Sequence, residues 1–359
     1  MRQLRVSPHH RLNLSSNDYF QMGTHPQVLE ASVRALQTWG AGSGASPLLG
    51  GYLSCHEELL EGLKSWIGKP EGLLFNTGFT LNQALVRHLV GPKDLVLTDR
   101  HIHHSIAQAL SAGKTRFHRF HHGDLRHLEQ LILQNRERCE TLFVVTESVY
   151  SMDGDCSDLK AIAEIKSRHP FVWILDEAHA LGTYGATGAG LAEEEKVLDA
   201  VDIFVGTLGK ALGTMGGFLL TSNPDIVDYL VNQAGEFIYS TYLNPPAAAG
   251  AAEALKLLRS GRDEARRLRS LGRDLRSRLS GAGWKTLGSD SPIVPLVPGD
   301  VETVLGLQKY YQDHGILVSA VRPPTVPKGT ARLRISLHTG VQKEDLDRIM
   351  DLLESWKGC

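Results

Sequence analysis

Short apolar segments alternate with helix-like segments through the first 220 residues, and this alternation constrains the fold more than any other feature. The apolar segments are 72–75, 95–98, 141–146, 172–176, 203–206 and 217–220. Continuous runs such as FVV and VWIL are typical of strands covered by helices on both faces. Between them, 124–136 places Leu125, Leu128, Leu131 and Ile132 at helical spacing. The pattern predicts an α/β fold with a mostly parallel sheet and helices on both faces.

The pattern changes after Pro245 and Pro246. A long helical stretch rich in Ala and Arg, 247–279, is followed by strand-like runs at 291–297, 316–320 and 331–337 and by a helix at 343–356. A chain of 359 residues with 42% hydrophobic composition can form two cores. We therefore expect an N-terminal segment, 1–22, a large domain, 23–243, and a smaller α+β C-terminal domain, 244–359.

Charge and cysteine content exclude several classes of protein. Lys and Arg number 38 and Asp and Glu 40, a net charge of -2, which favours neither nucleic acid nor a membrane surface as a partner. The four cysteines form no CxxC unit, which is typical of a reducing compartment. The N-terminus lacks the apolar region of a signal peptide, and no run approaches the roughly 18 apolar residues of a membrane span. We expect a cytoplasmic protein.

A cluster of arginines raises the question of whether the chain binds nucleic acid. The arginines of 262–278 surround an apolar stripe, and Asp263 and Asp274 precede Arg267 and Arg278 by four residues, which indicates an exposed helix face with ion pairs. Nucleic-acid binding is the alternative, but no aromatic residues are interleaved for stacking.

Histidines suggest a metal site in two places. His101, His103 and His104 follow Asp99, with His101 and His103 expected on one strand face, but no further ligand is spaced to complete a site. A second group, His118, His121 and His122, is interpreted as a polar loop. We expect no metal.

Three motifs follow apolar segments: NTGF (76–79), DEAH (176–179) and TLGK (207–210). Residues at the carboxyl ends of strands in an open α/β sheet face the ligand crevice. DEAH also occurs in helicases, but there it accompanies GxxxxGK[ST], which this sequence lacks. A single lysine after glycines is usually an exposed loop residue, and an aspartate that ends a strand is often a helix cap. The occurrence of all three motifs together favours a functional site.

Together the motifs supply what a phosphorylated pyridine aldehyde requires. Lys210 offers the amine for a Schiff base. Asp176 offers a carboxylate to keep the ring nitrogen protonated, and His179 a donor to the ring oxygen. A helix N-terminus suits the phosphate, and an imidazole suits the ring face. The candidates for the phosphate are Gly78, Phe79 and Thr207, and the candidate for the ring face is His103.

From about residue 12 to its end, the chain resembles the α-oxoamine synthases, a family of fold-type-I pyridoxal-phosphate enzymes. The motifs that carry the resemblance are NDYF (17–20), GSGASPLLGGY (42–52), NTGFTLNQ (76–83), TESVYSMDGD (146–155), LDEAH (175–179), TLGKALG (207–213), IYST (238–241) and RPPTVPKGTARLRISL (322–337). The resemblance implies pyridoxal 5'-phosphate as cofactor and an amino acid and an acyl-CoA or acyl-carrier protein as substrates. It also implies a homodimer with shared active sites.

The resemblance assigns roles to individual residues. Lys210 is implied as the Schiff-base lysine and the base at the substrate Cα, and His103 as the group that stacks on the ring. Asp176 is implied to bond the ring nitrogen, and His179 and Ser151 the ring hydroxyl. Gly78, Phe79 and Thr207 are implied at the phosphate. Arg334 is implied to bind the amino-acid carboxylate near Asn17, and Thr325 to lie by the acyl donor.

Members of the family differ in substrate, and the stretch 322–337 is most similar to members that use L-alanine. Glycine- and serine-using members remain the main alternative. An alternative of another class is a catalytically silent partner subunit, although the retention of Lys210, Asp176, His179 and Arg334 argues against it.

Overall fold

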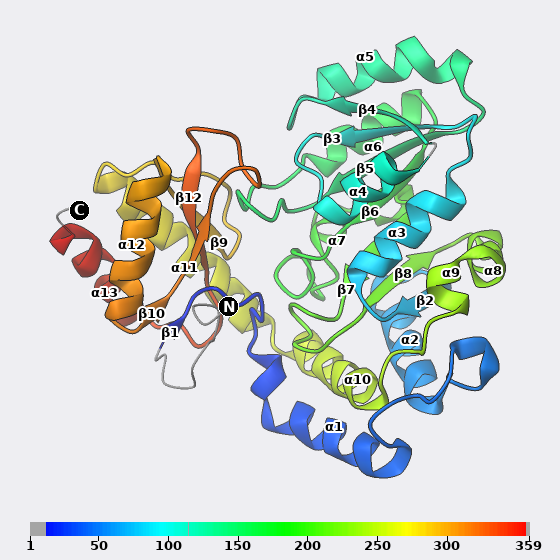
Figure 1. Ribbon diagram of the computed structural model, residues 1–359, viewed down its shortest axis with the longest axis horizontal. Helices are drawn as coiled ribbons and strands as arrows, with labels where there is room; N and C mark the ends of the chain where they lie inside the picture. The colour runs from blue at the N-terminus through cyan, green and yellow to red at the C-terminus, as the bar shows by residue number, and fades with distance from the viewer. Residues whose placement is uncertain (1–11, 114, 357–359) are drawn as a thin grey trace. The chain divides into compact units, whose positions relative to one another are not determined.

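The structure is a computed structural model that describes residues 12–113 and 115–356 (Figure 1). The chain divides into two compact units. The larger comprises 22–150 and 157–262, and the smaller comprises the described parts of 1–21, 151–156 and 263–359. The ranges expected from the sequence were 23–243 and 244–359. The difference arises because the helix at 245–260 packs on two helices of the larger unit.

The larger unit is built on a seven-stranded sheet with the order β2-β8-β7-β6-β5-β3-β4. β8 runs antiparallel to both of its neighbours, β2 and β7, and the other pairs are parallel. The strands are β2 (Glu71–Phe75), β3 (Leu95–Asp99), β4 (Arg116–Phe120), β5 (Leu142–Glu147), β6 (Val172–Asp176), β7 (Ile203–Thr207) and β8 (Gly217–Thr221). Six of the seven agree with the predicted segments to within one residue at each end. The predicted mostly parallel sheet is confirmed.

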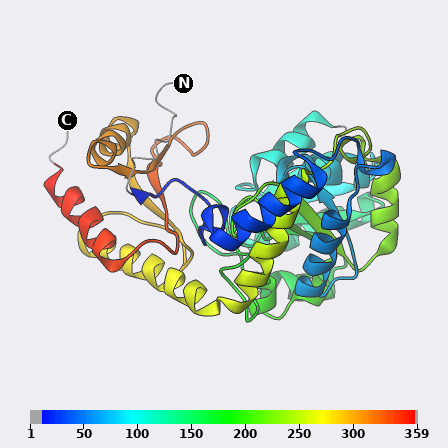
Figure 2. The ribbon, with the colours of Figure 1, turned by 90° about the horizontal axis from the view of Figure 1, so that it is seen from below.

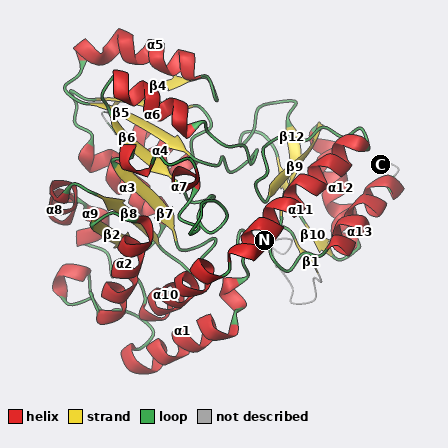
Figure 3. Cartoon of the chain, turned by 180° about the vertical axis from the view of Figure 1, so that it is seen from behind, coloured by secondary structure: helices red, strands yellow, loops and turns green. Residues whose placement is uncertain are grey.

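Helices flank this sheet (Figure 3). They are α1 (Pro26–Trp39), α2 (Ser54–Ile67), α3 (Gly78–Leu89), α4 (His104–Ala112), α5 (Leu125–Asn135), α6 (Leu159–Arg168), α7 (Leu191–Glu194), α8 (Pro224–Gln233), α9 (Gly235–Ile238) and α10 (Pro245–Ser260). Figure 2 shows α1 running alongside α10, its principal packing partner. The core includes Trp173, Phe204 and Phe218, which are fully buried. Gly206 is required beneath Phe218, because a Cβ atom there would lie 2.2 Å from the Phe218 ring.

The smaller unit combines a three-stranded antiparallel sheet, order β11-β12-β9, with a parallel pair, β1-β10. Its strands are β1 (Leu12–Asn13), β9 (Ile293–Gly299), β10 (Ile316–Leu317), β11 (Ser319–Val321) and β12 (Ala331–Ser336). Its helices are α11 (Arg262–Gly281, of which Arg262 belongs to the larger unit), α12 (Val301–Asp313) and α13 (Lys343–Ser355). The predicted α+β composition is therefore present.

Several sequence interpretations need correction. The single stretch 247–279 is two helices, because the chain leaves helical geometry at Gly261. The predicted strand 316–320 is divided between β10 and β11, which belong to different sheets. His118 lies in β4 rather than in a loop; RFHRF was missed because this edge strand is mostly exposed. His101 follows the end of β3 and shares no strand face with His103.

The arginines of α11 are less exposed than the spacing predicted: Arg266 and Arg273 are exposed, and the others are half-buried or buried. Arg278 pairs with Asp274 at 2.9 Å, as the spacing predicted, whereas Arg267 pairs with Glu264 rather than Asp263. Arg276 is buried, and its guanidinium donates to the backbone carbonyls of Leu287 and Ser291. It therefore holds α11 to the start of β9. Within the described ranges, no helix combines the length and apolarity needed to cross a membrane.

Candidate active site

Asp176 is the last residue of β6, at the carboxyl edge of the large sheet. Its side chain is 7% exposed. The Ala178 amide donates to Asp176 Oδ1 at 3.0 Å, and Asn82 Nδ2 donates to Oδ2 at 3.3 Å. These two donors stabilise a buried negative charge. His179, three residues further on, is also buried.

Lys210 lies three residues beyond the end of β7 and is half-buried. Its carbonyl accepts a hydrogen bond from the Gly213 amide at 2.9 Å, which closes a tight turn. Gly213 has φ +64°, and a Cβ atom there would lie 2.2 Å from the Gly23 nitrogen. Only glycine fits this turn, which fixes the backbone that carries Lys210.

His103 caps the N-terminus of α4. Its Nδ1 accepts from the Ser105 amide at 3.3 Å and lies 2.8 Å from Ser105 Oγ. Asn82 Nδ2 donates to that same hydroxyl at 3.0 Å, which leaves the hydroxyl proton for Nδ1. His103 is thereby assigned as the neutral Nε2–H tautomer. Burial lowers the pKa of His103. The negative charge of Asp176 opposes this shift, and the positive charge of Lys210 adds to it. His103, Asp176 and Lys210 are therefore close together.

The N-terminus of α3 and the end of β7 lie against each other. Thr77 caps α3, with its side chain accepting from the Thr80 amide at 3.0 Å, so Gly78 and Phe79 occupy the first turn. Thr207 Oγ1 donates to the Gly216 carbonyl at 3.0 Å and accepts from the Gly209 amide at 3.2 Å. A Cβ atom on Gly78 would lie 3.8 Å from Thr207 Oγ1. The three residues predicted for a phosphate are therefore neighbours at a helix N-terminus.

Arg334 is buried on β12, in the smaller unit. Its Nη1 donates to Asn17 Oδ1 at 2.9 Å and to Ser336 Oγ at 2.6 Å, and its Nε donates to the Ser151 carbonyl at 2.6 Å. Three residues singled out from the sequence are thus brought together. Thr325 is exposed in the turn after Arg322 and is not among these contacts.

Sequence reasoning missed four residues of these two clusters. Asn82 and Ser105 connect His103 to Asp176, as described above. Glu147 ends β5 beside Asp176. Tyr19 is fully buried against Arg334; burial raises its pKa to about 12, although the Arg334 charge opposes the shift. Asn82, Glu147 and Tyr19 lie within quoted motifs, but no sequence signal gave their partners.

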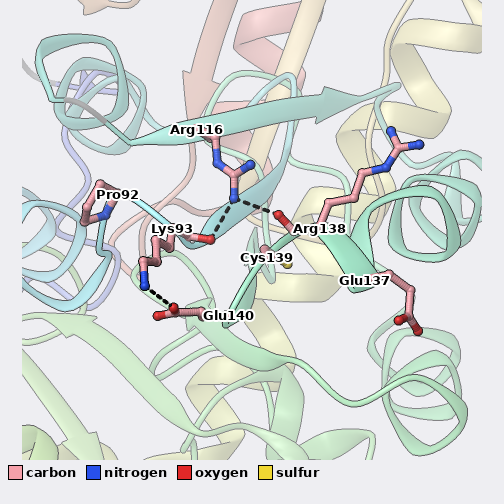
Figure 4. Close-up of a pocket in the computed structure, with 7 residues that line it drawn as sticks. All are labelled: Pro92, Lys93, Arg116, Glu137, Arg138, Cys139 and Glu140. Atoms are coloured by element: carbon pink, nitrogen blue, oxygen red, sulfur yellow. Dashed lines mark hydrogen bonds and ion pairs between the residues drawn. The ribbon is translucent and has the colours of Figure 1, made fainter.

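A separate hollow of about 510 Å³ lies elsewhere on the larger unit (Figure 4). Its lining residues are Pro92, Lys93, Arg116, Glu137, Arg138, Cys139 and Glu140. They surround the starts of β3, β4 and β5, the amino edge of the sheet. Arg116 donates to the Lys93 and Arg138 carbonyls, and Lys93 pairs with Glu140 at 2.6 Å. Because ligands bind at the carboxyl edge of such sheets, this hollow is not the candidate site.

Comparison with known proteins places this arrangement in a family. The sequence model of aminotransferase class I and II matches residues 9–353, and the chain belongs to this family. Among curated relatives, 8-amino-7-oxononanoate synthase of Aeromonas salmonicida (strain A449) is 37% identical and covers 99% of this chain and 90% of its own. The enzyme of that name from Methylococcus capsulatus (strain ATCC 33009 / NCIMB 11132 / Bath) is 39% identical over 96% of this chain and 88% of its own.

Solved structures agree with the sequence relatives. Serine palmitoyltransferase of Sphingomonas wittichii has a TM-score of 0.92 at 29% identity and covers 96% of this chain and 86% of its own. 8-Amino-7-oxononanoate synthase of Francisella tularensis has a TM-score of 0.83 at 25% identity, with coverages of 96% and 97%. The resemblance identified from the sequence motifs, and the fold class expected from it, are confirmed.

Proposed function

We propose that this chain condenses L-alanine with pimeloyl-CoA, or with pimeloyl-carrier protein, and releases carbon dioxide to give 8-amino-7-oxononanoate for biotin biosynthesis. The observation that carries the proposal is identity of 36–39% to curated 8-amino-7-oxononanoate synthases over nearly the whole chain. Lys210, Asp176, His179 and Arg334 are all present, which supports an active enzyme over a silent partner subunit.

The larger unit fits pyridoxal 5'-phosphate. Asp176 is a buried carboxylate with two donors, as a pyridinium partner requires. The cradle of Gly78, Phe79 and Thr207 offers helix N-terminal amides to a phosphate, together with a hydroxyl that would turn its proton from the Gly216 carbonyl to the phosphate. Asn82 Oδ1 is buried without a hydrogen-bond partner in the described structure, so this part of the site lacks a donor for that oxygen. When bound, the cofactor supplies an electron sink for negative charge at the amino-acid Cα.

Residues of the chain are assigned to holding the cofactor and to moving the proton. Asp176 would hold the proton on the ring nitrogen, and His103 would lie against the ring. His179 and, on the family resemblance alone, Ser151 would contact the ring oxygen. Lys210 would hold the cofactor through its amine and move the proton at the substrate Cα.

Arg334 is assigned to the substrate carboxylate, with Asn17 beside it. A guanidinium suits this role because it has five N–H donors, so three can hold the side chain in place while others remain for a carboxylate. The contacts of Arg334 with Ser151, Asn17 and Ser336 fix its orientation before substrate binds. Thr325 is assigned to the acyl-donor end on the family resemblance alone.

A cytoplasmic homodimer completes the proposal. Leu49 is 81% exposed and Tyr239 is 86% exposed, far more than large apolar side chains usually are in a monomer. The 3-10 turn Pro47–Leu49 contacts α9, and Tyr239 directly follows α9. Leu49 and Tyr239 thus belong to neighbouring segments, and we infer that they contact a second copy of the chain.

The runner-up is a serine-using enzyme of the same family, supported by the TM-score of 0.92 to a serine palmitoyltransferase. A substrate panel separates the two. The holoenzyme is given L-alanine, L-serine or glycine with pimeloyl-, palmitoyl-, acetyl- or succinyl-CoA, and release of free thiol is followed. We expect release with alanine and pimeloyl-CoA and none from Lys210→Ala. Release with serine and palmitoyl-CoA alone would overturn the substrate assignment.

A further inference from the structure

Glu147 is a buried carboxyl that the proposed mechanism does not use. It is the last residue of β5 and is in register with Asp176, the last residue of β6. Registered residues of neighbouring parallel strands point to the same face of the sheet, with backbones about 4.8 Å apart. Glu147 is 2% exposed. Two carboxyl groups therefore lie side by side at the carboxyl edge of the sheet, both removed from water.

The hydrogen bonds of the two carboxyls are unequal. Asp176 accepts from the Ala178 amide and from Asn82. Glu147 accepts from the backbone N–H of His103, while its Oε1 is buried and has no partner in the described structure. A carboxylate with two donors is stabilised in its charged form, whereas a buried oxygen without a donor disfavours charge. This asymmetry indicates that Asp176 carries the charge and Glu147 the proton.

The surrounding charges agree with this assignment. Burial is the largest influence on Glu147 and raises its pKa well above the ordinary value. The negative charges of Asp176 and Asp99 act in the same direction, and Lys210 and the His103 amide oppose them. Two buried carboxylates this close cannot both ionise without a large cost.

We propose that Glu147 is a positioning residue that stays protonated, anchors the His103 backbone, and leaves Asp176 as the single negative charge toward the cofactor ring nitrogen. The inference rests on the proposed function, because it takes Asp176 as the partner of that nitrogen. Glu147 adds a backbone contact to a chain of hydrogen bonds in which His103 bonds Ser105, Ser105 bonds Asn82, and Asn82 bonds Asp176. The imidazole and the carboxylate are thereby held relative to each other.

The proton on Glu147 is tested in the cofactor-free protein. Infrared difference spectra between wild type and Glu147→Gln are recorded at about pH 8.5, where an ordinary carboxyl is ionised. We expect a protonated-carboxyl band that Glu147→Gln lacks. Glu177→Gln is the matched control, because Glu177 is also buried but bonds the Leu191 and Ala192 amides instead, and this variant should keep the band. A wild-type spectrum without the band would overturn the proposal.

Cofactor affinity tests the positioning role. The dissociation constant of pyridoxal 5'-phosphate is measured for wild type, Glu147→Gln and Glu147→Leu. Glutamine mimics a protonated carboxyl, so its constant should stay within about threefold of wild type, whereas leucine leaves the His103 N–H unpaired, no longer holds His103 in place, and should weaken binding by clearly more than that. If both variants lost cofactor affinity to the same extent, the assignment of a proton to Glu147 would be wrong. Failure of wild type to bind would instead count against the proposed function, and the infrared band would still decide the proton.

Discussion

At the scale of single residues, the site depends on side chains that hydrogen bonds already orient before any ligand binds. Arg334 is the clearest case, because three acceptors fix its guanidinium within the smaller unit. A lysine has no planar fork and could reproduce only part of this arrangement. Charge alone is therefore not what the position requires.

Arg334→Lys should raise the KM for the amino acid about 10- to 100-fold, because an ammonium group cannot keep the contacts with Ser151, Asn17 and Ser336 and bind a carboxylate with the same charge-assisted hydrogen bond. The KM for the acyl donor should change little. Steady-state kinetics with each substrate varied in turn measure both. Arg273→Lys, on an exposed arginine of α11 in the same unit, is the control and should match wild type. An unchanged amino-acid KM in Arg334→Lys would show that the carboxylate binds elsewhere.

At the scale of elements, strand ends carry the site and buried polar groups hold the adjacent loops. Glu177, the second residue of DEAH, is fully buried and accepts from the Leu191 amide at 3.0 Å and the Ala192 amide at 2.7 Å. It secures the start of α7. Burial raises the pKa of Glu177 to about 7, although the hydrogen bonds from Ser148 and these amides oppose the shift.

A raised pKa makes stability depend on pH. Glu177 titrates at its ordinary value of 4.5 when unfolded and at about 7 when folded, so the folded state binds more protons between these values. Its contribution is fully present below pH 4.5 and is lost as pH rises through about 7, on the order of 3 kcal/mol in total. Denaturant unfolding across this range should show that decline in wild type.

Glu177→Gln should abolish this decline in the free energy of unfolding with rising pH. It should also cost some stability at every pH, because an amide cannot accept from both backbone donors. Glu140→Gln, at an exposed ion pair with Lys93, should leave the decline unchanged. An identical decline in wild type and Glu177→Gln would contradict the assignment.

The elements also show what a sequence can and cannot predict. Buried strands such as β5 and β6 were located within a residue because burial on both faces leaves a continuous apolar run. β4 was missed because an edge strand needs no such run. The motifs identified Asp176 and Lys210, but the network through Asn82, Ser105 and Glu147 depends on strand register and on a helix cap. Neither is determined by local composition, so that network could be found only in the structure.

At the scale of the whole molecule, the exposure of the apolar side chains of Leu48, Leu49 and Tyr239 is the feature that a single chain does not explain. Leu49→Asp should shift the protein from dimer to monomer in sedimentation velocity, because burying a new charge at an apolar contact is costly. Leu133→Asp, at a 54% exposed leucine on α5, is the control and should remain dimeric. A monomeric wild type would contradict the proposed homodimer.

The reaction itself is tested most directly by its stoichiometry. The holoenzyme is supplied with pimeloyl-CoA and L-alanine labelled with ¹³C in the carboxyl group, and free thiol, labelled carbon dioxide and product mass are measured together. We expect one labelled carbon dioxide for each thiol and a product with the mass of unlabelled 8-amino-7-oxononanoate. Thiol release without labelled carbon dioxide, or a product that retains the label, would contradict a decarboxylative condensation.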